Sequence, residues 1–285
     1  MMRGMYSAIS GLKNHQIMLD VTANDLANVN TVGFKASRVS FRDSLAQLQR
    51  SGASATTGTA GAKSAQIGLG VQLGSIDNLM TNGAFQSTGS PYDVAIQGSG
   101  WFRVSSDATA PNDATDEYTR AGNFTLTDTG YLATQDGWRV VGFGCDATTG
   151  ALTAAPPAGK AFIQIPTDAS DIAVSSTGAV TYTPAGGGSR MYAGYLSLTS
   201  FPSEAGLERA AANRWRQNAS SGTGSANVPG QAGLGSTIGG VLEMSNVDLA
   251  TEFTNMITAQ RGFEASSRVL STADEMLQDL VNLKR

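Results

Sequence analysis

Apolar residues recur at helical spacing near both ends of the chain. Over residues 1–32 they follow alternating four- and three-residue steps with one polar break: Met5, Ile9, Leu12, Gln16, Leu19, Ala23 and Leu26. Over residues 245–285 the same spacing extends further: Leu249, Phe253, Met256, Gln260, Phe263, Ser267, Leu270, Asp274, Leu277 and Val281. This pattern is typical of helices that pair as a coiled coil. We therefore predict one helix at each end of the chain and the pairing of the two.

The two helices carry matching features. Gly11 and Gly262 lie inside them, where each glycine costs about 1 kcal/mol relative to alanine, so close helix-to-helix approach is the expected gain. Gln16 and Gln260 break the two stripes, and such residues can fix the register of a helix pair if they meet. Ser245 or Asn246 is the expected N-cap of the second helix, with Asp248 and Glu252 in its first turn.

A simple energy comparison indicates that the N-terminal helix needs a partner. Its five larger stripe residues supply about 10 kcal/mol if fully buried. Ordering about 25 residues costs about 1 to 2 kcal/mol for each, and isolated helices form only marginally. Tyr6, Ile17 and Val21 lie off the stripe, so neighbouring subunits are expected to cover what the second helix leaves exposed.

The sequence between the helices predicts an α+β protein with Gly/Ser-rich extended linkers and one central, mainly antiparallel β-domain. Residues 33–90 are assigned to an extended linker region, in which residues 51–66 have no periodicity. Residues 91–204 contain short alternating stretches separated by turns such as Asp-Thr-Gly and form the predicted β-rich outer domain. Residues 205–244, rich in Gly and Ser, are assigned to a return linker.

Composition limits the possible functions. The 285 residues carry a formal charge of −4 with a pI near 5.0, which leaves no excess of cations for binding nucleic acid. The single Cys145 has no cysteine partner for a disulfide or a metal cage. No apolar run approaches the ~20 residues of a membrane span. The N-terminus lacks a continuous apolar stretch and a small-residue cleavage site, so a cleaved signal peptide is not expected.

Candidate chemistry is sparse. His15 is the only histidine and lies on the first predicted helix, where a polar position on a packed helix is the favoured interpretation. The glycine-rich stretches "GLGVQLG" and "GQAGLGST" lack the spacing and the lysine of phosphate-binding loops. Trp101 and Phe102 point to opposite faces of a strand, where core packing is favoured over a ligand groove. We expect no catalytic residues, no metal, no cofactor and no small-molecule substrate.

The stretch "ANDLANVNTVGFK" joins the first helix to the predicted linker region. Asn24 and Asn28 lie four residues apart on one helix face, where their amides can bond a neighbouring helix or the departing chain. Residues 30–33 are expected to end the helix, with Gly33 free to adopt positive φ and Phe34 anchoring the turn.

This stretch and three further blocks resemble the bacterial flagellar axial proteins of the hook and rod group. The further blocks are "DVAIQGSGWF", "YTRAGNFTLTDTGYL" and "SNVDLATEFTNMITAQRGFEASSRVLSTADEMLQDL". Asp25 stands where a second asparagine is more usual. Within the group, "MYSAISGLKNHQIMLDV" and "QIGLGVQLGSID" are more similar to the hook subunit, whereas the short chain, with one outer β-domain, keeps the distal rod subunit as the alternative.

The resemblance implies a non-enzymatic subunit that polymerises into the hook and transmits torque from rod to filament. It implies paired terminal helices in an inner tube, an outer β-domain, and export through the flagellar type III apparatus to the hook and basal body without a cleaved signal. Implied partners are further copies of the chain and other axial proteins of the rod, hook cap and hook-filament junction. The residues expected at subunit contacts are Leu12, Gln16, Leu19, Asn24, Leu26, Asn28, Thr31, Gly33, Phe34, Lys35, Phe253, Met256, Gln260, Arg261, Phe263, Leu270 and Leu277.

Two other classes remain open from the sequence. One is an adhesin-like binding module with Trp101 at a ligand groove on a helical stalk. The other is an enzyme, which rests only on His15 and scattered carboxylates.

Overall fold

The structure is a computed structural model that describes residues 2–52, 61, 63–107, 110–112 and 115–282. The chain divides into two compact units. We call Met1–Ala27, Ser37–Leu79 and Val247–Arg285 the helix unit, and Asn28–Ala36 with Met80–Asn246 the β unit. The loose segment expected at 51–66 lies largely outside the described residues, although its last residues enter a strand.

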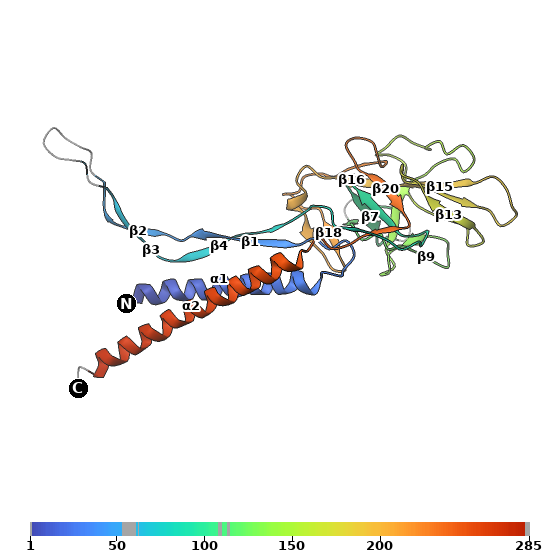
Figure 1. Cartoon of the computed structure of the whole chain (residues 1–285). Helices are drawn as coiled ribbons and strands as arrows, with labels where there is room; N and C mark the ends of the chain where they lie inside the picture. Colours follow the sequence, from blue (N-terminus) through green and yellow to red (C-terminus); the bar gives the residue numbers. More distant parts are fainter. Residues whose placement is uncertain (1, 53–60, 62, 108–109, 113–114, 283–285) are drawn as a thin grey trace. The chain divides into compact units, whose positions relative to one another are not determined.

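The helix unit contains two long helices and a two-stranded ribbon. The helices are α1 (Met2–Ala27) and α2 (Leu249–Asn282), and the strands are β1 (Ser37–Asp43), β2 (Ala46–Arg50), β3 (Ala65–Gly68) and β4 (Val71–Asn78). β1 pairs antiparallel with β4, and β2 with β3. The predicted linker at 33–90 is therefore extended, but much of it is a hydrogen-bonded ribbon (Figure 1).

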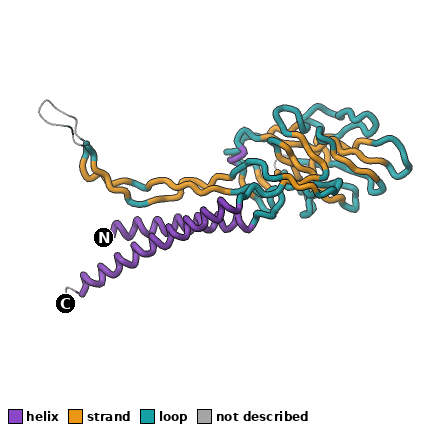
Figure 2. Tube along the Cα trace, viewed as in Figure 1, coloured by secondary structure: helices purple, strands orange, loops and turns teal. Residues whose placement is uncertain are grey.

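The helices run antiparallel and approach closely at small residues. A Cβ on Gly262 would lie 2.5 Å from Cε1 of His15, and one on Gly11 would lie 3.0 Å from Oγ of Ser266. A Cβ at Gly262 would clash with the His15 ring, whereas one at Gly11 would need only a small shift of the Ser266 hydroxyl, and the predicted close approach is confirmed. The start of α1 and the end of α2 consequently lie at the same end of the helix pair (Figures 1 and 2).

The face that each helix turns toward the rest of the unit differs from the predicted one. The more buried positions lie one residue toward the N-terminus, a rotation of about 100°. In α1 they are Ala8, Gly11, Thr22 and Asp25, with Asn14 buried against the ribbon, and in α2 they are Ala259 and Ala273. Several large residues of the predicted stripes, such as Leu12, Leu19, Met256 and Leu270, are half-buried. Gln16 and Gln260 are exposed, so the predicted register contact between buried glutamines is wrong for the single chain.

α1 also packs against the ribbon. The Asn14 amide donates to the Val71 carbonyl at 2.7 Å, and the Val71 N–H donates to Oγ of Ser10 at 3.3 Å. The Ser37 N–H donates to a carboxylate oxygen of Asp25 at 2.8 Å, which ties the start of β1 to the last turns of α1. Polar groups on α1 thus satisfy backbone groups of the ribbon.

Asp248 caps α2, whereas Ser245 or Asn246 was predicted. Its carboxylate accepts from the Ala250 N–H at 3.0 Å and from the Thr251 hydroxyl at 2.9 Å. These bonds satisfy a donor that the first helical turn leaves free. They also lower the pKa of the Asp248 carboxyl, with the Thr251 hydroxyl the largest contributor.

The β unit consists of short, mainly antiparallel strands. They are β5 (Phe85–Ser87), β6 (Val94–Gln97), β7 (Trp101–Ser105), β8 (Glu117–Thr119), β9 (Thr125–Leu126), β10 (Leu132–Ala133), β11 (Arg139–Phe143), β12 (Lys160–Phe162), β13 (Ser170–Val174), β14 (Ala179–Thr183), β15 (Met191–Leu196), β16 (Leu198–Ser200), β17 (Glu208–Arg209), β18 (Arg214–Arg216), β19 (Ser225–Asn227), β20 (Ser236–Gly239) and β21 (Val241–Glu243), with one 3-10 turn at Glu204–Gly206. The main path runs β13-β14-β15-β11-β7-β8-β18-β17.

Residues 205–244 belong to this unit and are not a return linker. β17 and β18 extend the main sheet from β8, β20 pairs with β6, and β21 pairs with β5. The Gly/Ser-rich composition misled the prediction because these strands are only two to four residues long, and all but β17, which pairs with the neighbouring β18, form through partners distant in the sequence.

Trp101 and Phe102 point to opposite faces of β7, as predicted, and both are fully buried. Phe102 belongs to the larger core with Val104, Val140 and Leu196. Trp101 belongs to a second cluster with Tyr118, Phe201, Leu207 and Trp215. Strand β7 is thus covered on both faces.

Among the described residues, neither long helix is apolar enough over a sufficient length to cross a membrane.

Candidate functional site

The segment after α1, residues 28–36, folds into the β unit. α1 ends at Ala27, and the Thr31 N–H donates to the Asn28 carbonyl in a turn. Gly33 has φ of +67°, and a Cβ there would lie 2.5 Å from the backbone nitrogen of Ala121. Its N–H donates to the Glu243 carbonyl at 2.8 Å. The predicted positive φ of Gly33 is therefore confirmed, and close backbone packing adds a second reason for glycine.

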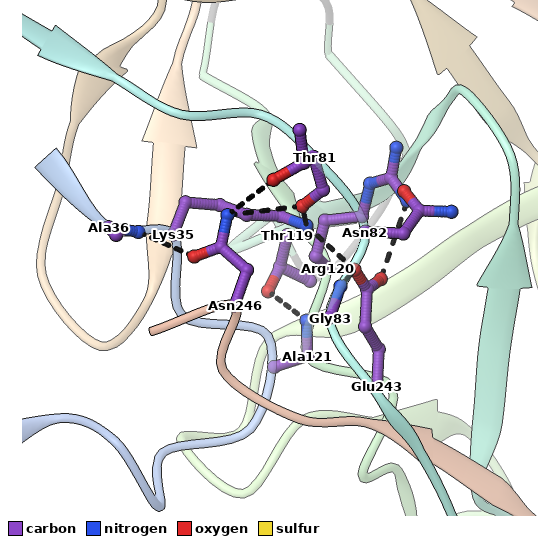
Figure 3. A network of polar contacts seen from close by, with 10 residues as sticks. All are labelled: Lys35, Ala36, Thr81, Asn82, Gly83, Thr119, Arg120, Ala121, Glu243 and Asn246. Carbon is purple, nitrogen blue, oxygen red and sulfur yellow. Dashed lines mark hydrogen bonds and ion pairs between the residues drawn. The ribbon is translucent and has the colours of Figure 1, made fainter. Parts of the chain in front are cut away.

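Lys35 enters a closed ionic network. Its ammonium donates to Oε1 of Glu243 at 2.6 Å and to the Thr81 carbonyl at 2.8 Å (Figure 3). Arg120 reaches Oε2 of the same carboxylate at 3.4 Å, and the Gly83 N–H donates to Oε1 at 3.0 Å. Glu243 and the Lys35 side chain have no exposed surface, and Arg120 has almost none. One carboxylate thus organises two cations and a backbone N–H.

Asn246 joins the same segments through uncharged hydrogen bonds. Its Oδ1 accepts from the Ala36 N–H at 2.7 Å, and its Nδ2 donates to Oγ1 and the carbonyl of Thr81 at 3.0 and 3.2 Å (Figure 3). Its backbone N–H donates to the Phe34 carbonyl at 3.4 Å. We call Lys35, Arg120, Glu243 and Asn246, together with Thr81, which accepts from Lys35 and Asn246, the polar clamp.

Phe34 is anchored by a stack of rings and guanidinium groups. The Arg209 guanidinium lies 4.8 Å from the centre of the Phe34 ring and 5.2 Å from that of Trp215. Trp215 packs edge-on against Trp101, and Arg120 lies 5.2 Å from the Trp101 ring. Arg209 also donates to the Lys35 carbonyl at 2.6 Å. Cation–π contacts of this kind each contribute about 0.5 to 2 kcal/mol.

Burial dominates the electrostatics of the clamp. Desolvation lowers the pKa of the Lys35 ammonium below its ordinary value, and the adjacent Glu243 carboxylate opposes that shift. Desolvation likewise lowers the pKa of Arg120, again opposed by Glu243. Removing one member of such a buried set leaves an uncompensated charge, so the clamp is expected to tolerate substitution poorly.

The predicted contact residues fall into three groups by exposure. Gln16, Asn24, Phe253, Gln260, Arg261 and Phe263 are exposed. Leu12, Leu19, Leu26, Asn28, Thr31, Met256, Leu270 and Leu277 are half-buried. Gly33, Phe34 and Lys35 are buried in the β unit of their own chain. A role in subunit assembly stays a prediction for the set, and burial makes that role indirect for the last three.

The helix unit leaves many large apolar side chains in solvent. On α1 they include Tyr6 and Ile9, at 65% and 46% exposed. On α2 they are Leu249, Phe253, Ile257, Phe263, Val269, Met276 and Val281, at 38% to 68% exposed. On the ribbon they are Phe41, Leu45, Leu48, Ile67, Leu69 and Ile76 together with Leu79 just after it. Leu249, Phe253 and Ile257 recur at four-residue steps and so share one face of α2, and an apolar face of this kind marks a site of protein association.

The remaining chemical candidates are structural. The His15 ring packs against Gly262 and lies edge-on to Phe41 at 6.2 Å. Trp101 has no exposed surface, so core packing is confirmed and the alternative of an adhesin-like groove at this residue is wrong. Within the described residues, no cluster of His, Cys, Asp or Glu could hold a metal ion. Burial, then Asp146, raises the pKa of the Cys145 thiol, which disfavours the reactive thiolate.

Sequence reasoning missed Arg120, Arg209, Glu243 and Asn246 as partners of the GFK stretch. Nothing in local sequence joins Lys35 to Glu243, which lies 208 residues away. The sequence held a partial signal, namely a lysine directly after the apolar turn residue Phe34. A lysine in such a position is rarely buried unless a distant carboxylate pairs with it.

Comparison with family models covers the same three regions that meet in the clamp. The model "Flagella basal body rod protein" matches residues 5–35, which include Lys35. The model "Flagellar hook protein FlgE/F/G D1 domain" matches residues 95–182, which include Arg120. The model "Flagellar basal body rod FlgEFG protein C-terminal" matches residues 238–283, which include Glu243 and Asn246. Paired terminal helices, a central β unit and these matches define a structural flagellar axial subunit.

Individual relatives agree. The flagellar basal-body rod protein FlgG of Bacillus subtilis (strain 168) is 45% identical, with 100% of both chains covered. The protein of the same name from Caulobacter vibrioides is 36% identical over 99% of this chain and 100% of its own. The chain belongs to the flagellar hook and rod axial protein family, whose members are structural proteins and not enzymes.

The hook assignment fits less well than its alternative. The flagellar hook protein FlgE of Borreliella burgdorferi is 25% identical with 100% of both chains covered, but the 285 residues of this chain are spread over 447 aligned positions. The FlgG relative from Bacillus subtilis aligns over 287 positions. The comparisons therefore support the hook only at the level of the family and favour the rod alternative.

Proposed function

We propose that the protein is the distal rod subunit of the bacterial flagellum, a non-catalytic protein that polymerises with copies of itself and transmits torque. The exposed apolar surface of the helix unit is the observation that supports the proposed polymerisation. Leu249, Phe253 and Ile257 form one stripe at 44% to 50% exposure on α2. Because each side chain is already about half buried, a monomer that kept it in water would forgo about 0.7 to 1.5 kcal/mol, half the value for complete burial.

The packing inside the chain explains why this surface is left over. α1 and α2 meet through small residues such as Gly11, Gly262 and Ser266. Much of the larger apolar stripe predicted from the sequence is rotated away from that contact and remains available to other subunits. Further proposed partners are the neighbouring axial proteins of the basal body, and we propose export by the flagellar type III apparatus without a cleaved signal.

The proposal of rod rather than hook is tested by electron microscopy of basal bodies from a deletion strain of the source bacterium. Truncated rods are the expected result. Complete rods without hooks would return the assignment to the hook, and normal flagella would refute both assignments.

The assembly surface is tested by the double substitution Phe253→Ser and Ile257→Ser in the purified chain. We expect the helical content of the monomer to be retained, because both side chains are about half exposed, and polymerisation to be lost. Thr254→Ser is the matched control, since this exposed hydroxyl bonds only the Ala250 carbonyl of its own helix. Polymers of normal length from the double variant would contradict the proposed surface.

A further inference from the structure

The clamp lies where the chain enters and leaves the β unit. The chain passes between the two units at four places: after Ala27, after Ala36, after Leu79 and after Asn246. Ala36 and Asn246 are the last β-unit residues at two of these passages, and Thr81 is the second β-unit residue at a third.

Hydrogen bonds tie these three passages directly together. Asn246 accepts from the N–H of Ala36 and donates to Thr81. Lys35, one residue before its passage, donates to Thr81 and Glu243. The Gly83 N–H, near the third passage, donates to the same carboxylate. Glu243 and Asn246 therefore each join these segments through their side chains, in addition to the backbone hydrogen bonds between them.

A force that reaches the β unit through any of these three segments arrives next to the residues that the clamp joins. With the clamp closed, tension on one segment is transferred to the other two by buried, charge-assisted hydrogen bonds, which are stronger than neutral ones. With the clamp open, only neutral backbone hydrogen bonds and the pairing of β5 with β21 join the segments. Strands β5 and β21, which continue two of the segments, have only three residues each.

Building on the proposed function as a torque-transmitting subunit, we propose that Glu243 and Asn246 are positioning residues that join three chain passages into one mechanical joint. The joint is needed under rotational load, and it is needed less for folding or polymerisation. Arg120 and Lys35 hold the Glu243 carboxylate in place.

The test compares Glu243→Gln with Asp116→Asn in flagellated cells. Asp116 is the matched control, because it forms a buried ion pair with Arg103 in the same unit, with side chains 0% and 3% exposed, at no chain passage. Asn246→Ala is the second test variant, since it removes the ties to Ala36 and Thr81 without burying a lone charge. Basal bodies are counted by electron microscopy, and swimming speed is measured in media of low and high viscosity.

We expect Asn246→Ala to build rods of normal number and length, and Glu243→Gln to build fewer rods, because Lys35 and Arg120 lose their buried counter-charge. At high viscosity both clamp strains should lose about half or more of the swimming speed that the Asp116→Asn strain retains, because failure under force follows the unfolding rate. Equal speeds of clamp and control strains at high load would overturn the joint, as would loss of rods in both clamp strains. Normal flagella in the deletion strain would instead refute the proposed function, so the two failures are distinguishable.

Discussion

Replacing Lys35 by methionine is a direct test of the clamp as a source of stability. The substitution keeps an unbranched chain of similar bulk, one atom shorter, but removes the ammonium that donates to Glu243 and Thr81 at 2.6 and 2.8 Å. The Glu243 carboxylate then keeps only Arg120, at 3.4 Å, and the Gly83 N–H. Breaking a buried ion pair on one side typically costs about 3 to 5 kcal/mol. We expect the lower end, about 3 kcal/mol, because Arg120 still compensates part of the charge.

Urea unfolding followed by tryptophan fluorescence measures this loss of stability in the β unit, where the clamp lies. Trp101, Trp138 and Trp215 are the only tryptophans, and all three lie in the β unit. With a denaturant slope of about 2 kcal/mol/M, a loss of about 3 kcal/mol lowers the midpoint by about 1.5 M.

The control is Arg190→Met, which removes an ion pair to Asp171 in the same unit whose side chains are 49% and 68% exposed. Exposed pairs contribute about 0 to 1 kcal/mol, so its midpoint should move little. A loss at Lys35 no larger than the loss at Arg190 would refute the view that the buried network holds residues 28–36 in place.

Three further outcomes are expected. Gly262→Ala should lower the thermal midpoint of the helices in circular dichroism, since its Cβ would meet the His15 ring at 2.5 Å. Gly4→Ala, whose Cβ would have no atom within 4 Å, should raise that midpoint slightly. Equal effects of the two substitutions would contradict the close packing. The pKa of the Asp248 carboxyl is depressed, so the cap that it forms is complete above the ordinary carboxyl value of 3.8 and is lost as pH falls through the lower folded value. Amide exchange at Ala250 should therefore rise as pH falls through that window, and this rise should be absent in Asp248→Asn. Gly33→Ala should destabilise the β unit by more than the ~1 to 2 kcal/mol of a left-handed backbone alone, because its Cβ also meets Ala121; a smaller loss in urea unfolding would show that the turn relaxes.

The helices were predictable because their signal is local. Alternating apolar steps and a cap-rich start located α2 to within four residues of its observed start, and glycine after a polar turn predicted positive φ at Gly33. The helix faces were not predictable from apolar spacing. Close packing selected Gly11, Gly262 and Ala259 over neighbouring leucines and phenylalanines, because small side chains allow the backbones to approach.

The end of the β unit was mispredicted for a related reason. Residues 205–244 look like a linker because their strands are very short, yet β17 to β21 pair with other strands or extend them. Strand pairing across long sequence separations leaves little trace in local composition. Asn246 was mispredicted as a helix cap because its amide is equally suited to bond other backbone groups, here those of Ala36 and Thr81.

By itself the sequence determined two terminal helices, a β-rich centre, a tight glycine turn after the first helix and membership in a family of axial proteins, because all of these are written in short-range patterns. Only the tertiary structure decided which helix face stays open for other subunits and which distant residues receive Lys35. Those outcomes depend on side chains separated by up to 208 residues, and the free energy of burying a charge is settled only where its partners meet.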